Sequence, residues 1–451
     1  MYDTIAAIST PLGMGAIGVV RVSGKEVANI INKSLKKNKY KPKKMYYGWV
    51  YDEDQIVDEI TWVFHKQPNS YTGEDMLEIF CHGGKLVTYN VLKTVIKSGA
   101  RQALPGEFSK RAVLNGKMDL IKAEAINSLI KSETPFSLNA TLKLLKDNQL
   151  SEAIEELKRL LMNMAAEIEV ELDYPDEVEI NSSDLKEKIL YIMKKIDKIL
   201  TEADNGIIAV EGVKTVIVGK PNSGKSTLLN ALLKKDRAIV TEIPGTTRDT
   251  IEENLNINGI LLKLIDTAGI RRTEDKIEKI GIERTLNAID ESDLILFILD
   301  GTTPFDYEDE LIYSKIKDLK NKTVIIVLNK SDSENFKLSN CPTKLFEKKY
   351  DIVTISAKNR EIKSLEDKIY ELYFEKVNIE EPTLTNMRQK NTLEMSKLYL
   401  LKALNSLESG FPNDVAMIDI RKALEKIYEL TGENYTEELL NTIFSNFCVG
   451  K

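Results

Sequence analysis

The apolar positions along the chain repeat with different periods in different segments. Long stretches repeat apolar residues at steps of three and four, as one face of an α-helix does. The clearest such face carries Ile154, Leu157, Leu161, Met164 and Ile168. A second helix is predicted over 184–203, with Asp184 and Glu187 in the spacing of a capping box, and helical character returns from about 384 to the end.

Between the helical stretches, short runs rich in β-branched residues alternate with helix-forming segments. The strand-like runs cover residues 215–218, 261–265, 324–328 and 352–355, and residues 226–233 favour a helix. This alternation predicts a mostly parallel sheet covered by helices. We expect this part to be inserted into a helical domain that the two flanking segments build together.

The N-terminal segment has a third pattern of apolar and polar residues, with short strands and a helix. Strands are predicted over 3–9 and 16–22, around a turn-rich 11–15, and a helix over 86–98. The chain is therefore predicted to be multidomain, with mixed α/β and all-α parts. The predicted parts are an N-terminal α/β domain (1–117), a helical domain in two pieces (118–211 and 377–451, the second with the C-terminal tail) and an inserted nucleotide-binding domain (212–376).

Composition and charge exclude some classes of protein. A chain of 451 residues with 42% hydrophobic residues has room for roughly two to four domains with buried cores. The net charge of −7 argues against binding nucleic acid through bulk charge, although the lysines within 33–44 form either a solvated loop or a local RNA contact. Three cysteines without a C-x-x-C pair suggest neither zinc nor a disulfide framework. Without a signal peptide or an apolar run of about 18 residues, we expect a soluble, cytoplasmic protein outside the membrane.

The segment 219–226 reads Gly-Lys-Pro-Asn-Ser-Gly-Lys-Ser and matches the phosphate-binding loop G-x-x-x-x-G-K-[ST]. It lies between a predicted strand and a predicted helix, where backbone N–H groups and a helix N-terminus can surround phosphate oxygens. Lys225 is expected to reach the β- and γ-phosphates, and the Ser226 hydroxyl to bind Mg²⁺. The other predicted nucleotide contacts of this loop are Asn222, Ser223, Gly224 and Thr227.

Two further motifs place groups near the γ-phosphate. Asp266 and Gly269 belong to Asp-Thr-Ala-Gly, which ends the second strand-like run. The carboxylate is expected to hold Mg²⁺ through water, and the glycine N–H to contact the γ-phosphate. Thr247, within 244–249, is expected to add a Mg²⁺ ligand that depends on the γ-phosphate, which predicts a switch.

The last two motifs concern the base. One ends the third strand-like run and the other the fourth, and they contribute Asn329, Lys330 and Asp332, and Ser356, Ala357 and Lys358. The Asp332 carboxylate can accept hydrogen bonds from the N1–H and amino group of guanine, a donor pair that adenine lacks. Ligands of open α/β sheets bind at the carboxyl ends of strands, so the five motifs together predict a GTP site and a GTPase.

One position departs from Ras-like enzymes, in which a Gln after the glycine of this Asp-x-x-Gly motif orients the attacking water. Here that position is Ile270, so either hydrolysis is slow or another group orients the water. Glu278 is a candidate for that role, and the alternative is a solvated helix face. The amide of Asn222 could also help to hold a monovalent cation beside the phosphates.

Taken together, these motifs resemble the MnmE (TrmE) family of tRNA-modification GTPases over nearly the whole chain. The resemblance is carried by residues 72–75, 82–84, 104–108, 115–120, 173–177, 219–226, 245–249, 280–284 and 447–451. It implies a potassium-dependent GTPase that, with an FAD-binding MnmG-type partner, builds an aminomethyl or carboxymethylaminomethyl group on C5 of a wobble uridine in tRNA. It also implies an N-terminal domain that resembles folate-dependent one-carbon enzymes, binds a tetrahydrofolate and forms a homodimer.

The same resemblance implies roles for individual residues. The positions that match its folate contacts are Arg21, Glu78, Lys117 and Lys451. Those that match its potassium site are Asn222, Thr241, Ile243 and Thr246. Glu278 matches the water-orienting glutamate and would act beside Lys225 and Thr247. Cys448, which is either exposed on the tail or buried at a helix end, is a candidate for chemistry.

Functions of other classes stay open on the sequence. A ribosome-assembly or RNA-binding GTPase without folate chemistry would share the phosphate loop and the Asp-Thr-Ala-Gly motif, and a purely regulatory switch protein is a third possibility. An RNA-binding GTPase would carry an RNA-binding module, and the sequence shows no KH-type G-x-x-G loop in a basic context. Folate binding by the N-terminal segment would separate these hypotheses.

Overall fold

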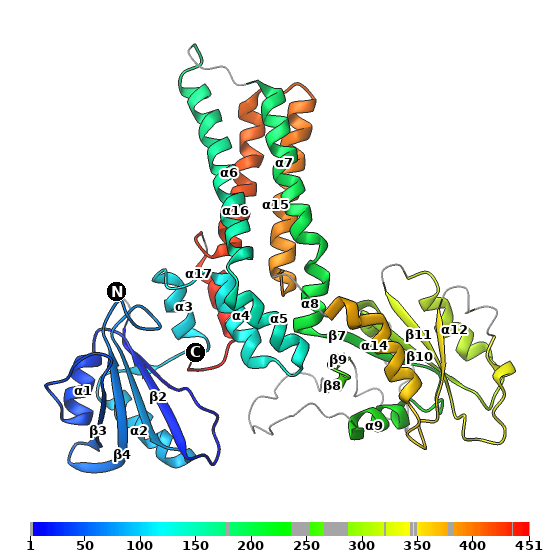
Figure 1. Ribbon diagram of the computed structural model, residues 1–451, viewed down its shortest axis with the longest axis horizontal. Coiled ribbons are helices and arrows are strands. Elements are labelled where there is room, and N and C mark those ends of the chain that lie inside the picture. Colours follow the sequence, from blue (N-terminus) through cyan, green and yellow to red (C-terminus); the bar gives the residue numbers. More distant parts are fainter. Residues whose placement is uncertain are drawn as a thin grey trace. The chain divides into compact units, whose positions relative to one another are not determined.

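The computed structural model describes residues 3–176, 181–235, 253–265, 287–319, 322–342, 346, 350–377, 383–434 and 436–450 (Figure 1). The chain divides into two compact units. The first comprises Met1–Asn127, Ser151–Ile196 and Asn391–Lys451, and the second comprises Ser128–Leu150 and Asp197–Lys390. Each unit contains one six-stranded sheet together with helices.

The sheet of the first unit has the strand order β3-β4-β5-β2-β1-β6. Its strands are β1 (Ile5–Ile8), β2 (Ile17–Ser23), β3 (Met45–Asp52), β4 (Gln55–His65), β5 (Met76–His82) and β6 (Arg101–Gln102). Neighbouring strands are antiparallel except β1 and β6, which are parallel. The sheet is therefore mixed, and β1 and β2 confirm the strands predicted over 3–9 and 16–22.

Helices α1 (Val27–Leu35) and α2 (Lys85–Lys97) share a hydrophobic core with one face of this sheet. Alternation along β2 shows why: Val20 and Val22 are fully buried in that core, whereas Arg21 between them points to the other face. Trp62 of β4 is buried in the same core. One face of the sheet is thus filled, and polar groups gather on the opposite face.

Four long helices of the first unit lie side by side (Figure 1). They are α6 (Gln149–Asp173), α7 (Ser182–Thr201), α15 (Met387–Glu408) and α16 (Asn413–Thr431). The predicted apolar face of α6 is confirmed, since all five of its residues are buried. Ion pairs such as Lys195 with Glu156, at 3.0 Å, join α7 to α6. The side chain of Asn413 also donates to Glu171 across 2.8 Å, which ties α16 to α6.

The predicted start of α7 was wrong by two residues. The helix begins at Ser182, and the Asn181 side chain accepts a hydrogen bond from the Ser183 N–H at 2.9 Å. Asp184 lies in the first turn and is not the capping residue. Asn is as good a cap as Asp, so the spacing of Asp184 and Glu187 was a coincidental match to the capping box.

Shorter helices connect these parts of the first unit. They are α3 (Glu107–Leu114), α4 (Leu120–Lys131) and α17 (Glu437–Ser445). Leu120 of α4 and Leu440 and Phe444 of α17 pack in one small buried cluster. This cluster brings the C-terminal helix against residues 107–131, although more than three hundred positions separate them in the sequence.

The sheet of the second unit has the order β12-β11-β10-β7-β9-β8. Its strands are β7 (Val213–Val218), β8 (Glu253–Ile257), β9 (Ile260–Leu264), β10 (Leu294–Asp300), β11 (Thr323–Asn329) and β12 (Asp351–Thr354). All neighbours are parallel except the hairpin of β8 and β9. The mostly parallel sheet predicted from the alternation of strands and helices is confirmed.

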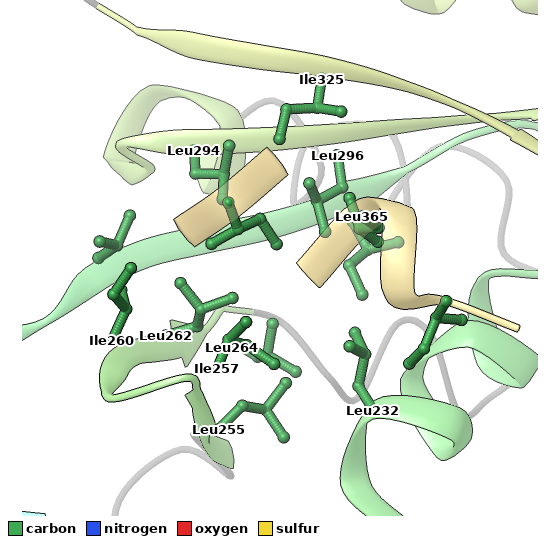
Figure 2. Packing of buried hydrophobic residues seen from close by; sticks show 14 of the residues in the cluster. Leu232, Leu255, Ile257, Ile260, Leu262, Leu264, Leu294, Leu296, Ile325 and Leu365 are labelled. Atoms are coloured by element: carbon green, nitrogen blue, oxygen red, sulfur yellow. The ribbon is translucent and has the colours of Figure 1, made fainter. Parts of the chain in front are cut away.

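Both faces of this sheet are buried, which explains its continuous apolar strands. Leu294 and Leu296 of β10 pack with Leu365 of α14 (Lys363–Val377) on one face (Figure 2). Ile295 and Phe297 of the same strand pack on the other face, with residues of α12 (Tyr307–Ile316). Other helices among the described residues of this unit are α5 (Pro135–Lys146), α8 (Ala203–Glu211) and α9 (Lys225–Lys235). Within the described residues, no helix is both long and apolar enough to cross a membrane.

Candidate nucleotide-binding site

The phosphate loop connects β7 to α9, as the motif predicted. Two of its glycines could not be replaced without strain: a Cβ on Gly219 would lie 2.4 Å from the Ile298 carbonyl oxygen, and one on Gly224 would lie 2.1 Å from the Asn329 amide nitrogen. Both glycines and Asn222 have positive φ angles. The loop is therefore packed tightly between β10 and β11, and its backbone bends as a phosphate-binding loop requires.

Lys225 is the first residue of α9, and its ammonium is already positioned by the loop. The Nζ atom donates to the carbonyl oxygens of Gly219 and Lys220, each at 2.8 Å. Burial lowers the pKa of Lys225. An ammonium has three donors, so these two bonds leave one donor to point toward a phosphate oxygen. Ser226 and Thr227 follow in the first turn of the same helix.

Asn329 joins the phosphate loop to the last motif. It is the final residue of β11; its Nδ2 atom donates to the Ser223 carbonyl at 3.0 Å, and its Oδ1 atom accepts from the Ala357 N–H at 3.0 Å. Both polar atoms of the side chain thus have a hydrogen-bond partner inside the protein. Its structural task is to hold two loops, separated by more than one hundred residues, at the same edge of the sheet.

The groups predicted to recognise the base lie on the adjoining loops. One Asp332 carboxylate oxygen accepts from the Ser356 hydroxyl at 2.6 Å, and this hydrogen bond lowers the pKa of Asp332. Asp332 is thus held as an anion that can accept two further hydrogen bonds. Lys330 has a positive φ angle and donates to Asp300 at 2.6 Å, while Lys358 is exposed to solvent.

Several predicted residues lie outside the described residues. These are Thr241, Ile243, Thr246, Thr247, Asp266, Gly269, Ile270, Glu278 and Lys451. Asp266 comes directly after Ile265, whose N–H donates to the Thr215 carbonyl at 2.9 Å. The strand that leads to the Asp-Thr-Ala-Gly motif therefore lies beside the strand that leads to the phosphate loop. The roles assigned to these nine residues stay predictions.

In the first unit, the structure brings together two of the residues predicted to contact folate. Arg21 and Glu78 are register partners on β2 and β5, and their side chains form an ion pair of 2.9 Å. The second oxygen of Glu78 lies 3.4 Å from the His65 ring. The Arg21 guanidinium also lies over the Tyr71 ring, 5.8 Å from its centre. His65 and Tyr71 were missed by the sequence analysis, because neither belongs to a recognisable motif.

Lys117 contacts the same β4–β5 loop that carries Tyr71. Its Nζ atom donates to the Pro68 carbonyl at 2.9 Å, and its stem packs near Gly73. The C-terminal tail also reaches this part of the unit: the Ser9 hydroxyl donates to the Gly450 carbonyl at 3.0 Å, and the Gly106 N–H donates to the Cys448 carbonyl at 3.3 Å. The exposed alternative for Cys448 is confirmed.

The site in the second unit defines a class of protein. A glycine-strained phosphate loop, a lysine held at its centre and an asparagine that ties it to a guanine-type specificity loop are the features of a P-loop GTP-binding domain.

Comparisons with known proteins place the chain within that class. Residues 4–117 match the model of the GTP-binding protein TrmE N-terminus, and residues 120–448 match that of the MnmE helical domain. The tRNA modification GTPase MnmE of Petrotoga mobilis is 69% identical, and that of Thermotoga maritima is 47% identical, each over 100% of both chains. The chain therefore belongs to the MnmE (TrmE) family of tRNA modification GTPases.

A solved structure of Aquifex aeolicus Era with GDP and AlF4- is also similar to part of the chain. It is 30% identical, covers 42% of this chain and 67% of its own, and has a TM-score of 0.28. A TM-score this low supports no argument about function. The assignment to a family of tRNA modification GTPases therefore rests on the family models and on the full-length relatives.

Proposed function

We propose that this chain is a potassium-dependent GTPase that modifies C5 of a wobble uridine in tRNA, together with an FAD-binding MnmG-type partner and with a tetrahydrofolate as one-carbon donor. The added group would be aminomethyl or carboxymethylaminomethyl. The observation that carries the proposal is the junction at Asn329, which holds the phosphate loop and the base-recognition loop together. Membership of a family of tRNA modification GTPases supports tRNA as the substrate.

The residues present suit GTP and its metal ions. Asn222 is exposed in the phosphate loop and has a positive φ angle, and amide oxygens are suitable ligands for hard cations. We assign the potassium site to Asn222 with Thr241, Ile243 and Thr246, and the magnesium site to Ser226 and Thr247, with Asp266 acting through water. Bound cations at these positions would neutralise charge on the phosphates.

Hydrolysis then needs a group that aligns water. Ile270 has no polar side chain, and Glu278 is the residue to which we assign this role. Lys225 would direct its third donor to the β- and γ-phosphates, since its other two donors are already used. Thr247 would join the site when the γ-phosphate is present.

Folate binding is supported by the charges on the face of the first sheet opposite α1 and α2. Arg21 and Glu78 form their ion pair there, with less than a quarter of each side chain exposed. An arginine suits the carboxylates of a folate, and a glutamate suits the ring N–H donors. Lys117 lies at the adjoining loop, and the docked tail places Gly450, the neighbour of Lys451, beside Ser9. We assign no chemical step to Cys448, which the same docking leaves exposed.

The same sheet face supports a homodimer through the N-terminal domain. The strand register aligns Met45, Val63, Glu78 and Arg21 across β3, β4, β5 and β2. Met45, Tyr47 and Ile17 on this face are each more than half exposed. Large exposed apolar side chains beside a polar cluster are typical of an interaction surface.

None of the three cysteines, all in the described part of the chain, forms a disulfide, which suits a reducing cytoplasm.

Calorimetry with a reduced folate tests this proposal against an RNA-binding GTPase without folate chemistry. The full chain should bind the folate, and Arg21→Ala should weaken that binding while leaving GTP affinity unchanged. Lys97→Ala provides a control, because Lys97 pairs with Asp52 on the surface away from this cluster. A full chain that binds GTP but no reduced folate, even as a verified dimer, would refute the folate assignment.

A further inference from the structure

The second residue of the phosphate loop, Lys220, is buried and paired with two carboxylates. Its Nζ atom lies 2.7 Å from Asp306 Oδ2 and 2.8 Å from Asp309 Oδ2. Only 9% of Lys220 is exposed. A lysine at this position of the motif is not needed to contact phosphate, because Lys225 has that task, so its burial requires a separate explanation.

Both carboxylates are fixed by the helix that they begin. Asp306 caps α12, where it accepts from the N–H groups of Glu308 and Asp309, and the Asp309 carboxylate accepts from the Asp306 N–H in return. Asp309 is 2% exposed, and its other oxygen has no hydrogen-bond partner among the residues that the structure describes. A buried carboxylate of this kind is costly without a cation, and Lys220 is the cation that compensates it.

The backbone of Lys220 faces the catalytic machinery. Its carbonyl oxygen accepts from Lys225 Nζ at 2.8 Å and from the Ser223 N–H at 3.3 Å. The side chain of Lys220 therefore holds α12 while its carbonyl holds Lys225. The helix itself is anchored in the sheet core through Tyr313 and Ile316.

We infer that Lys220 is a positioning residue for GTP binding, whose clamp on Asp306 and Asp309 fixes the carbonyl that aims Lys225 at the β- and γ-phosphates. The inference rests on the proposed role of Lys225. It predicts that α12, which belongs to no motif of the GTP site, influences nucleotide binding. Hydrogen bonds to Asp306 and Asp309 raise the pKa of Lys220 despite its burial, so Lys220 stays charged at neutral pH, whereas burial raises the pKa of Asp309.

The test removes the clamp without leaving a buried charge unpaired. In Lys220→Met/Asp309→Leu, an apolar pair replaces the buried ion pair, an exchange that proteins often tolerate. GTP and GDP affinity, measured with a fluorescent nucleotide, should fall about tenfold while the thermal midpoint without nucleotide stays close to that of the unmodified chain. The single variant Lys220→Arg, which keeps the charge and the donors, should retain most of the affinity of the unmodified chain.

Lys158→Met provides a matched control. Lys158 is similarly buried, with 12% of its side chain exposed against 10% for Lys220, and it also pairs with two carboxylates, those of Glu155 and Glu433. It lies on a helix of the other unit. Its removal should leave nucleotide affinity unchanged, which shows that losing a buried lysine pair is not by itself enough.

A second comparison separates positioning from stability. In a Lys225→Ala background, removing the clamp should weaken GTP binding by less than about twofold, because the clamp acts through Lys225. Equal losses in both backgrounds, or wild-type affinity in a folded clamp variant, would overturn the inference.

If the double variant does not fold, Asp306→Asn provides a second test, because it keeps the buried Lys220–Asp309 pair. It should weaken GTP binding about two- to threefold, and unchanged affinity there would also overturn the inference. Unaltered GTP turnover in Lys225→Ala would instead refute the proposed role of Lys225.

Discussion

The turn between β8 and β9 offers a prediction whose size can be worked out from the structure. Asn258 and Gly259 both have positive φ angles, of 52° and 95°, as a tight two-residue hairpin requires. A Cβ on Gly259 would lie 2.7 Å and 2.9 Å from two ring carbons of Phe136 in α5. That ring is held edge-on by Phe374 of α14, with ring centres 5.9 Å apart, so it cannot move away freely.

Gly259→Ala should therefore destabilise the second unit through two effects. The left-handed backbone costs an alanine about 1–2 kcal/mol, and overpacking against the ring adds about 1–3 kcal/mol. We expect a total loss of about 2–5 kcal/mol in the free energy of unfolding. Since β9 leads directly to Asp266, a displaced hairpin should also weaken GTP binding that depends on Mg²⁺.

The assay must report on the correct unit. Both tryptophans, Trp49 and Trp62, lie in the first unit, so intrinsic tryptophan fluorescence would not detect this change. Hydrogen exchange of the β10 amides in increasing denaturant reports the opening of the second unit. In a Phe136→Ala background, the same Gly259→Ala change should cost only the backbone term. An equal loss in both backgrounds, or a loss below about 0.5 kcal/mol in the unmodified background, would refute the packing argument.

Three further predictions concern the nucleotide site. Asp332→Asn should weaken GTP binding and favour xanthosine triphosphate, whose extra carbonyl suits an amide donor; competition between the two nucleotides measures this, and wild-type GTP preference would contradict the base assignment. Asn222→Ala should bind GTP but lose potassium stimulation of turnover, by about 10²-fold; a variant that potassium still stimulates fully would exclude Asn222 as a ligand. Glu278→Ala should keep GTP affinity but reduce single-turnover hydrolysis by about 10²-fold, and an unchanged rate in potassium would rule out the water-orienting role.

Much of the fold could be predicted from periodicity, and the exceptions have physical reasons. The buried face of α6 and the strands β7, β9, β11 and β12 were found because their apolar residues recur with one period or precede a motif. The central strand β10 was missed. Its run Leu294–Asp300 is buried on both faces, so it has no alternation, and no motif of the GTP site ends it. The predicted domain boundaries were placed by motifs, and they stay predictions. The two compact units are defined instead by which segments pack together.

The candidate site likewise has a part that could be predicted from the sequence and a part that could not. Residues that touch nucleotide belong to contiguous motifs and could be predicted. Lys220 lies inside such a motif, but its partners Asp306 and Asp309 lie 86 and 89 residues away, and a cap of α12 gives no sign that it faces the phosphate loop. The contact of His65 with Glu78 likewise depends on strand register, and that of Tyr71 with Arg21 depends on the path of the β4–β5 loop, and both appear only in the folded chain.

The measurement that most directly tests the proposed mechanism is the rate of GTP hydrolysis by the full chain in potassium and in sodium at equal ionic strength. Asn222 is exposed in the phosphate loop, and we assign it to a potassium site that would supply positive charge beside the phosphates. We expect turnover in potassium to exceed that in sodium by about 10²-fold. Equal rates in the two salts, with magnesium saturating, would contradict this account of the GTP site.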